Sequence, residues 1–317
     1  MLTKTRVTTR VRVRHLVEGN DSSGYRQQLN LNDVLDHAIA ILPEDAYCLI
    51  LLVDHDLYED DEDDFCCGRA YGGSRICVVS SAQYQPALDA WHGLKTEEGH
   101  FWPGSHCAEF VNAACGAPSK AASLKKRKAK AVEEKSAFGE KQRRPGRSAP
   151  DAIVIDSSMV EDNGDIDRST PLEEALAAHR ASMERHMPSE GGLMSLYLRR
   201  LTLTASHELL HCFGLDHCVY HACVMQSTAS IMEDSRQPPY LCPVCENKLA
   251  RALWDIQSKG LQVGPSSGGW WEASSIVGWT KARDQAIVTF CEARSKDDLG
   301  FASLGAWTRT ILSFGSE

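Results

Sequence analysis

The stretch HELLHCFGLDHC, residues 207–218, constrains this chain more than any other. Its first two histidines stand four positions apart, so on a helix both side chains lie on one face and can hold one metal ion. Glu208 directly follows the first histidine and is angled away from such an ion, where it can act as a base on a water molecule. Gly214 allows a sharp turn, after which a third histidine can return to the metal. The spacing therefore predicts a zinc site on a helix, with the ligands His207, His211 and His217.

Cysteines follow this stretch closely and indicate a second metal site. Five of the twelve cysteines fall between positions 212 and 245. In a chain without a secretory leader, clustered cysteines indicate metal ligation before disulfides. Cys212 lies too close to His211 to share its metal easily. The other four form one wider and one narrower pair, which suits a tetrahedral structural zinc site, and His221 is an alternative to one of them. These four are Cys218, Cys223, Cys242 and Cys245.

Hydrophobic patterning predicts an α/β fold. Asn30–Leu42 has the pattern of a helix capped by Asn30 or Asn32. The wholly apolar run Ala46–Val53 is typical of a central strand buried on both faces, and Ile76–Ser80 is expected to form a second strand. Residues 193–213 are expected to form the helix that carries HELLH, which Gly214 ends. A later helix is expected over residues 246–256.

The segment 117–150 differs from the rest of the chain, since it holds eleven Lys or Arg and few large apolar residues. Such a composition buries too little surface to offset its ordering entropy, so we expect disorder. Its two basic clusters, within residues 125–147, suit either a nuclear import signal read by an import receptor or a solubilising loop. Nucleic-acid binding is not favoured, because aromatic residues are not interleaved and the whole chain has a net charge of −9.

These patterns divide the chain into four parts. Residues 1–116 are the first part of a catalytic domain, 117–190 a basic and then acidic disordered insertion, 191–260 the zinc-binding part, and 261–317 a tail without an assigned role. The N-terminus lacks the apolar core of a secretory signal, and the apolar runs are too short to span a bilayer. We therefore expect a protein of the cytoplasm, the nucleus or both, which is neither secreted nor membrane-bound.

The motifs together resemble a known family. The pattern H-E-x-x-H-x-x-G-x-x-H, followed by CVM (223–225) and CPVC (242–245), resembles the archaemetzincins, a branch of the metzincin zinc peptidases. DHDLY (54–58) and FCCGRA (65–70) look like further segments of that family, and residues 237–249 are similar to its eukaryotic members. The resemblance covers about half the chain, in two blocks around the basic insertion. The gap between Met225 and Cys242 is one residue shorter than in the family pattern, a change that a loop tolerates.

The resemblance implies a compact metzincin-like α/β domain with a twisted mixed sheet, an antiparallel edge strand above the cleft and a zinc knuckle built from four cysteines. By analogy, Ile76–Ser80 would be the edge strand that pairs with an extended peptide. Each chain would bind two zinc ions, a catalytic one at the three histidines and a structural one at the four cysteines. Glu208 would be the general base, and Met225 would be the Met-turn residue beneath the metal, without binding it.

The implied activity is hydrolysis of peptide or protein substrates by a zinc-activated water. Endopeptidase and aminopeptidase action both remain open. Two alternatives come from other functional classes: a non-catalytic zinc-binding scaffold, and a nuclear interaction protein that works through the basic insertion. Glu208 argues against the scaffold, because a purely structural zinc site has no need of a base beside its first ligand.

Overall fold

The computed structural model describes residues 8–16, 25–94, 101–106, 169–183, 190–258 and 276–314. All elements below belong to one compact unit, Met1–Cys107 with Thr170–Glu317. The basic segment 125–147 lies outside the described residues, so its disorder and its role in nuclear import stay predictions. Within the described ranges, no helix combines the length and the apolar character needed to cross a membrane.

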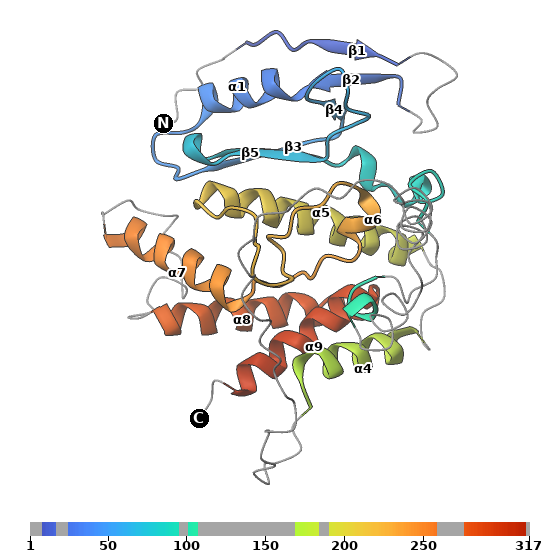
Figure 1. Ribbon diagram of the computed structural model, residues 1–317, viewed down its shortest axis with the longest axis vertical. Coiled ribbons are helices and arrows are strands. Elements are labelled where there is room, and N and C mark those ends of the chain that lie inside the picture. Colours follow the sequence, from blue (N-terminus) through green and yellow to red (C-terminus); the bar gives the residue numbers. More distant parts are fainter. Residues whose placement is uncertain are drawn as a thin grey trace, which may run out of the picture. The chain divides into compact units, whose positions relative to one another are not determined.

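Two three-stranded sheets form the β part of the unit (Figure 1). One has the order β1-β2-β4, in which β1 (Val13–His15) pairs antiparallel with β2 (Gln27–Asn30) and β2 pairs parallel with β4 (Asp56–Tyr58). The other has the order β3-β6-β5, in which β3 (Leu49–Val53) lies parallel and β5 (Gly68–Tyr71) antiparallel to β6 (Ile76–Ser80). Both sheets are mixed, which confirms the predicted α/β class.

The predicted order of the strands is wrong. Strand β6 has the predicted bounds, but it is the middle strand and not the edge, and all five of its residues are buried. The antiparallel edge strand is β5. Strand β3 begins later than predicted and lies at the opposite edge, where Leu52 is 55% exposed. An apolar run indicates burial, but the position of a strand in its sheet depends on partners that are distant in sequence.

Helix α1 (Leu31–Ile41) covers one face of the β3-β6-β5 sheet. The side chain of Asn30 accepts a hydrogen bond from the backbone N–H of Asp33, so Asn30 and not Asn32 is the N-cap. The buried side chains of α1 pack against those of β6 and against alternate residues of β3. They form a core of Leu31, Val34, Leu35, Ala38, Leu57, Ile76 and Val78.

Helix α5 (Glu190–Cys212) packs against β5 and β6 from the other side and carries the HELLH stretch. The close packing of α5 against β5 depends on two glycines, Gly68 in the strand and Gly72 directly after it. A Cβ at Gly68 would lie 3.0 Å from Cγ of Glu208, and one at Gly72 would lie 2.7 Å from the carbonyl oxygen of His211. Gly214 has φ +81° and ends the helix, as predicted.

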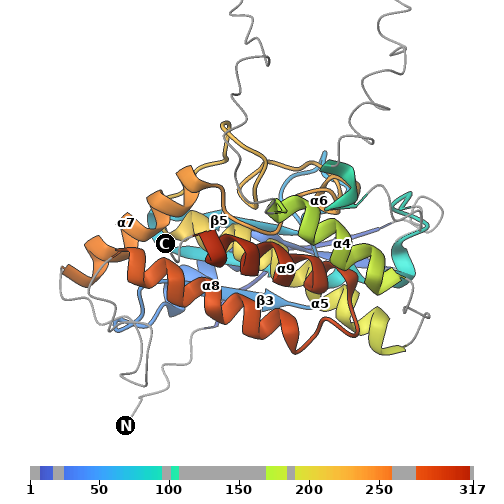
Figure 2. The same ribbon diagram turned by 90° about the horizontal axis from the view of Figure 1, so that it is seen from below.

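Further helices form a third layer beneath α5 (Figures 1 and 2). Helix α4 (Pro171–Met183) packs against α9 (Leu299–Phe314), which also packs against α8 (Ile276–Glu292). The short helix α6 (Ile231–Asp234) and helix α7 (Pro243–Ser258) follow α5 in the chain, and α7 contacts α8.

Helix α4 corrects the prediction of a disordered insertion over 117–190, because Pro171–Met183 within it form a helix. It begins where Thr170 and Glu173 cap each other, a local signal that the acidic composition concealed. The tail 261–317 had no predicted role or structure. Helices α8 and α9 form an ordered part of it.

Candidate metal centres and cleft

Helix α5 and the turn after it bring the three predicted histidines together. The ring centroids of His207 and His211 lie 4.8 Å apart, and the ring of His217 lies 5.3 Å and 5.0 Å from them. One ligand atom from each histidine lies within 4.8 Å of the others. His207 is buried and His217 is exposed, so the cluster opens to solvent on one side.

The hydrogen bonds of two histidines assign their tautomers. Nδ1 of His207 lies 2.6 Å from the carbonyl oxygen of Val224, and Nδ1 of His211 lies 2.6 Å from that of Leu215. A carbonyl oxygen only accepts, so each Nδ1 carries the proton and each Nε2 is left with a lone pair. Burial is the main cause that lowers the pKa of His207 to about 4, which keeps its ring neutral.

The geometry of these nitrogens fits a metal ion. The Nε2 atoms of His207 and His211 are 3.1 Å apart. Two unprotonated nitrogens cannot hydrogen-bond to each other, and their facing lone pairs repel unless a cation lies between them. Nitrogens bound to one tetrahedral zinc at about 2.1 Å are about 3.4 Å apart, close to the observed spacing. Carbonyls that hold the other ring nitrogen are the usual outer partners of metal-binding histidines.

Glu208 is buried beside this cluster, against Gly68 of β5. Burial raises the pKa of its carboxyl to about 7, a shift that the charge of Arg69 reduces and that of Asp234 increases. A carboxyl with this environment releases and takes up protons near neutral pH, which suits a general base.

The four predicted cysteines form the second cluster, and each sulfur lies within 4.8 Å of the others. The sulfurs of Cys218 and Cys242 are 3.7 Å apart, and those of Cys223 and Cys245 are 4.0 Å apart. These distances are far too long for disulfides. They match the separation of about 3.8 Å between thiolates bound to one tetrahedral zinc at about 2.3 Å.

The remaining predicted residues lie near these clusters. Met225 is fully buried in a core with Leu210, Leu215 and the cysteines Cys223, Cys242 and Cys245. Cys212 is buried on α5 and its thiol donates to the carbonyl of Glu208, apart from both ligand sets. His221 is exposed and belongs to neither cluster.

A cleft of about 920 Å³ contains the histidine cluster and Glu208. All six residues of the FCCGRA segment line it, as does the loop after Met225. The lining residues that were not predicted from the sequence include Tyr84, Thr204 and Asp234. None of them lies in a recognisable motif. Thr204 stands one helical turn before Glu208 on α5, whereas packing between distant segments brings Tyr84 to the cleft.

Comparisons with known proteins identify the segment that holds both clusters. Residues 189–251 match the family model described as Peptidase family M54. Archaemetzincin-2 of Homo sapiens is 43% identical over 61 residues, which are 19% of this chain and 17% of that protein. Archaemetzincin of Thermococcus kodakarensis is 39% identical over 83 residues, which are 25% of this chain and 45% of that protein.

A solved structure also matches, the crystal structure of archaemetzincin from Methanopyrus kandleri. The TM-score is 0.34 at 18% sequence identity, with 72% of this chain and 67% of that chain covered. The matched sequence spans less than half the length of the human and Thermococcus relatives. The resemblance to the archaemetzincins predicted from the motifs is confirmed over the segment that carries the two ligand clusters.

Proposed function

We propose that this chain is a zinc-dependent metallopeptidase that hydrolyses peptide bonds in peptide or protein substrates. The observation that carries the proposal is the pair of unprotonated Nε2 atoms of His207 and His211, 3.1 Å apart, beside Glu208. With His217 as the third ligand, three protein ligands leave one coordination position open, which is the arrangement of catalytic and not of structural zinc sites.

Each residue of the site then has a role. His207, His211 and His217 would hold zinc, which would supply a Lewis acid for the peptide carbonyl and for a water molecule. Glu208 takes the proton from that water and passes it to the departing amine. Because burial raises the pKa of Glu208 to about 7, its carboxylate is a stronger base than an exposed one.

The substrate, in this proposal, lies along β5. This strand pairs with β6 on one side only among the described strands, and Gly68, Arg69 and Ala70 line the cleft. Its other side offers backbone N–H and C=O groups to an extended peptide, which would add to the sheet as a further strand. Such pairing holds the scissile bond in a fixed register above the histidines.

The four cysteines hold a second, structural zinc, so that each chain binds two ions. Cys218 directly follows His217, and its backbone N–H donates to the carbonyl of Met225 at 2.7 Å. Zinc at the cysteines therefore fixes the segment on which His217 returns to the first site. Met225 serves as the Met-turn residue, a buried thioether that supports the site without binding the metal.

The test is Glu208→Gln, which keeps the shape of the side chain and removes the base. Zinc content and cleavage of a mixed peptide library are measured on the wild type and the variant. We expect unchanged zinc content and a loss of cleavage by a factor of at least about 100, the usual range for general-base catalysis.

Cleavage at the wild-type rate by the zinc-loaded variant would contradict the role of Glu208. A wild type that binds two zinc ions but cleaves no peptide would favour the alternative of a non-catalytic zinc scaffold.

A further inference from the structure

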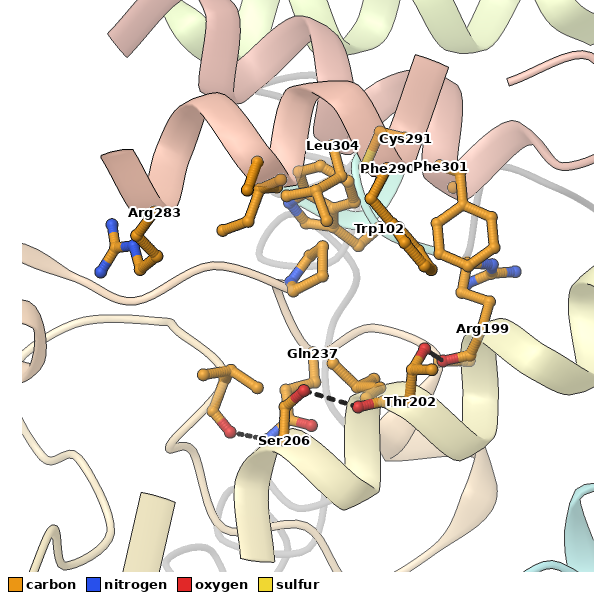
Figure 3. A pocket seen from close by; sticks show the side chains of 17 residues that line it. Trp102, Arg199, Thr202, Ser206, Gln237, Arg283, Phe290, Cys291, Phe301 and Leu304 are labelled. Carbon is orange, nitrogen blue, oxygen red and sulfur yellow. Dashed lines mark hydrogen bonds between the residues drawn. The ribbon is translucent and has the colours of Figure 1, made fainter. Parts of the chain in front are cut away.

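Behind α5, on the side away from the β3-β6-β5 sheet, lies a second cavity of about 410 Å³ (Figure 3). Its walls come from α5, α8, α9 and the loop after Met225. Apolar side chains such as Phe290, Phe301 and Leu304 predominate. Gln237 is the one residue that the linings of this cavity and of the cleft with the histidines share among the described residues. Two hydrogen bonds hold its side chain in place.

These hydrogen bonds lead to the backbone around Met225. The side-chain Nε2 of Gln237 donates to the carbonyl of Val224 at 2.9 Å and to that of Gln226 at 2.7 Å. Both amide hydrogens are used, and the two accepting carbonyls flank Met225. Gln237 is only 7% exposed, so water does not readily replace it as a donor. One side chain therefore fixes the conformation of the Val224–Gln226 turn.

The same carbonyl of Val224 accepts the hydrogen bond from Nδ1 of His207 at 2.6 Å. This bond assigns the tautomer of His207 and the direction in which its Nε2 lone pair points. Gln237 thus acts on His207 through one shared oxygen atom. The backbone N–H of Val224 also donates to the carbonyl of Tyr240 at 2.8 Å, so the segment is held from both sides.

We infer that Gln237 is a positioning residue for the histidine metal site: its amide holds the Val224 carbonyl where it orients His207. The inference rests on the proposed function only in taking the histidines as metal ligands, and it does not require peptide cleavage. Outer partners of metal-binding histidines change metal affinity by roughly 10–100-fold when removed. Because Gln237 acts through a carbonyl, we place its effect near the lower end, at about 10-fold.

The test uses two replacements of similar length, Gln237→Met, which removes both donors, and Gln237→Glu, whose carboxylate accepts but does not donate to a carbonyl. Gln285→Met is the matched control, since Gln285 is exposed on α8, far along the chain from either cluster. Zinc affinity is measured by chelator competition. The two sites are distinguished with Co²⁺, because only the cysteine site gives a thiolate charge-transfer band.

We expect both Gln237 variants to bind metal about 10-fold more weakly at the histidines, with an altered Co²⁺ visible spectrum, while the cysteine site and the control keep wild-type affinity. Histidine-site affinity within about twofold of wild type in both variants would overturn the inference. Equal weakening at the cysteine site would also overturn it, since Gln237 would then support the fold in general. If the wild type binds zinc at the histidines but cleaves no peptide, the proposed function fails and this measurement still decides the role of Gln237.

Discussion

At the scale of single residues, Asp234 is an unusual carboxylate in the cleft wall. Burial raises the pKa of its carboxyl from 3.8 to about 6, and a hydrogen bond with Thr228 only partly offsets this, while Glu233 adds a like charge. Between these two pH values the folded chain keeps a proton that the unfolded chain has released. The contribution of Asp234 to stability is therefore present below about pH 4 and falls as the pH rises towards 6 and beyond.

We predict that Asp234→Asn stabilises the protein at neutral pH but not at pH 4. The free energy of unfolding of the variant exceeds that of the wild type by on the order of 2 kcal/mol near pH 7. Denaturant unfolding of both proteins from pH 4 to pH 7 checks this, with the exposed Asp297→Asn as the control. A difference between Asp234→Asn and wild type that stays constant with pH would contradict the buried state of this carboxyl.

The sequence predicted site residues where the ligand pattern is local. The histidines stand on one helix and its turn, and the cysteines of each pair are at most five positions apart, so local spacing indicated these candidate ligands. Gly68 and Gln237 were not predicted as site residues. Gly68 reaches Glu208 from a segment far away in the chain, and Gln237 reaches Val224 across a loop without regular spacing. A single sequence encodes neither contact as a ligand pattern.

At the scale of elements, the packing of β5 against α5 fixes the position of Glu208, the proposed base. A Cβ at Gly68 would lie 3.0 Å from Cγ and 3.2 Å from Oε1 of Glu208, closer than a side chain there can be accommodated without movement. The same Cβ would lie 3.3 Å from the methyl carbon of Thr204, so it would meet the side chains of both Glu208 and Thr204. An added methyl group must therefore displace the carboxylate of Glu208 or separate strand from helix.

We predict that Gly68→Ala lowers kcat by at least about tenfold, because small displacements of a catalytic group are costly, while zinc stays bound. Steady-state kinetics and metal content of the purified variant check this. Gly73→Ala is the control, since its Cβ would meet nothing within 4 Å. Wild-type kcat in Gly68→Ala would mean that the position of Glu208 does not depend on this contact.

The ends of helices were predicted well, because they depend on neighbouring residues. The order of the strands was predicted poorly, because it depends on residues far apart in the chain. The end of α5 at Gly214 depends on neighbouring residues and is confirmed, and the cap of α1 is Asn30, one of the two residues that the sequence offered for it. The prediction exchanged the edge and middle strands because it did not recognise β5 as a strand. The sequence of β5, GRAY, has no long apolar run. A strand that borders a cleft needs a free edge more than it needs apolar residues, so composition did not reveal it.

At the scale of the whole molecule, the C-terminal helices support the segment beneath the histidines. Trp307 of α9 stacks on Tyr240 with ring centroids 4.1 Å apart and an interplanar angle of 8°. Tyr240 in turn accepts from the N–H of Val224 through its carbonyl. Arg283 of α8 pairs with Glu246 of α7, next to the cysteine site. Helices α8 and α9 thus belong to the scaffold of both candidate metal sites, although they carry no motif.

The central claim is that one chain binds two zinc ions at separate sites, one of them at the HELLH helix. Zinc per chain, measured by mass spectrometry on the wild type and on His211→Ala, tests it most directly. We expect about two zinc ions in the wild type and about one in the variant, since the cysteine site keeps its ion. An equal zinc content in the two proteins would contradict a metal site at His207, His211 and His217.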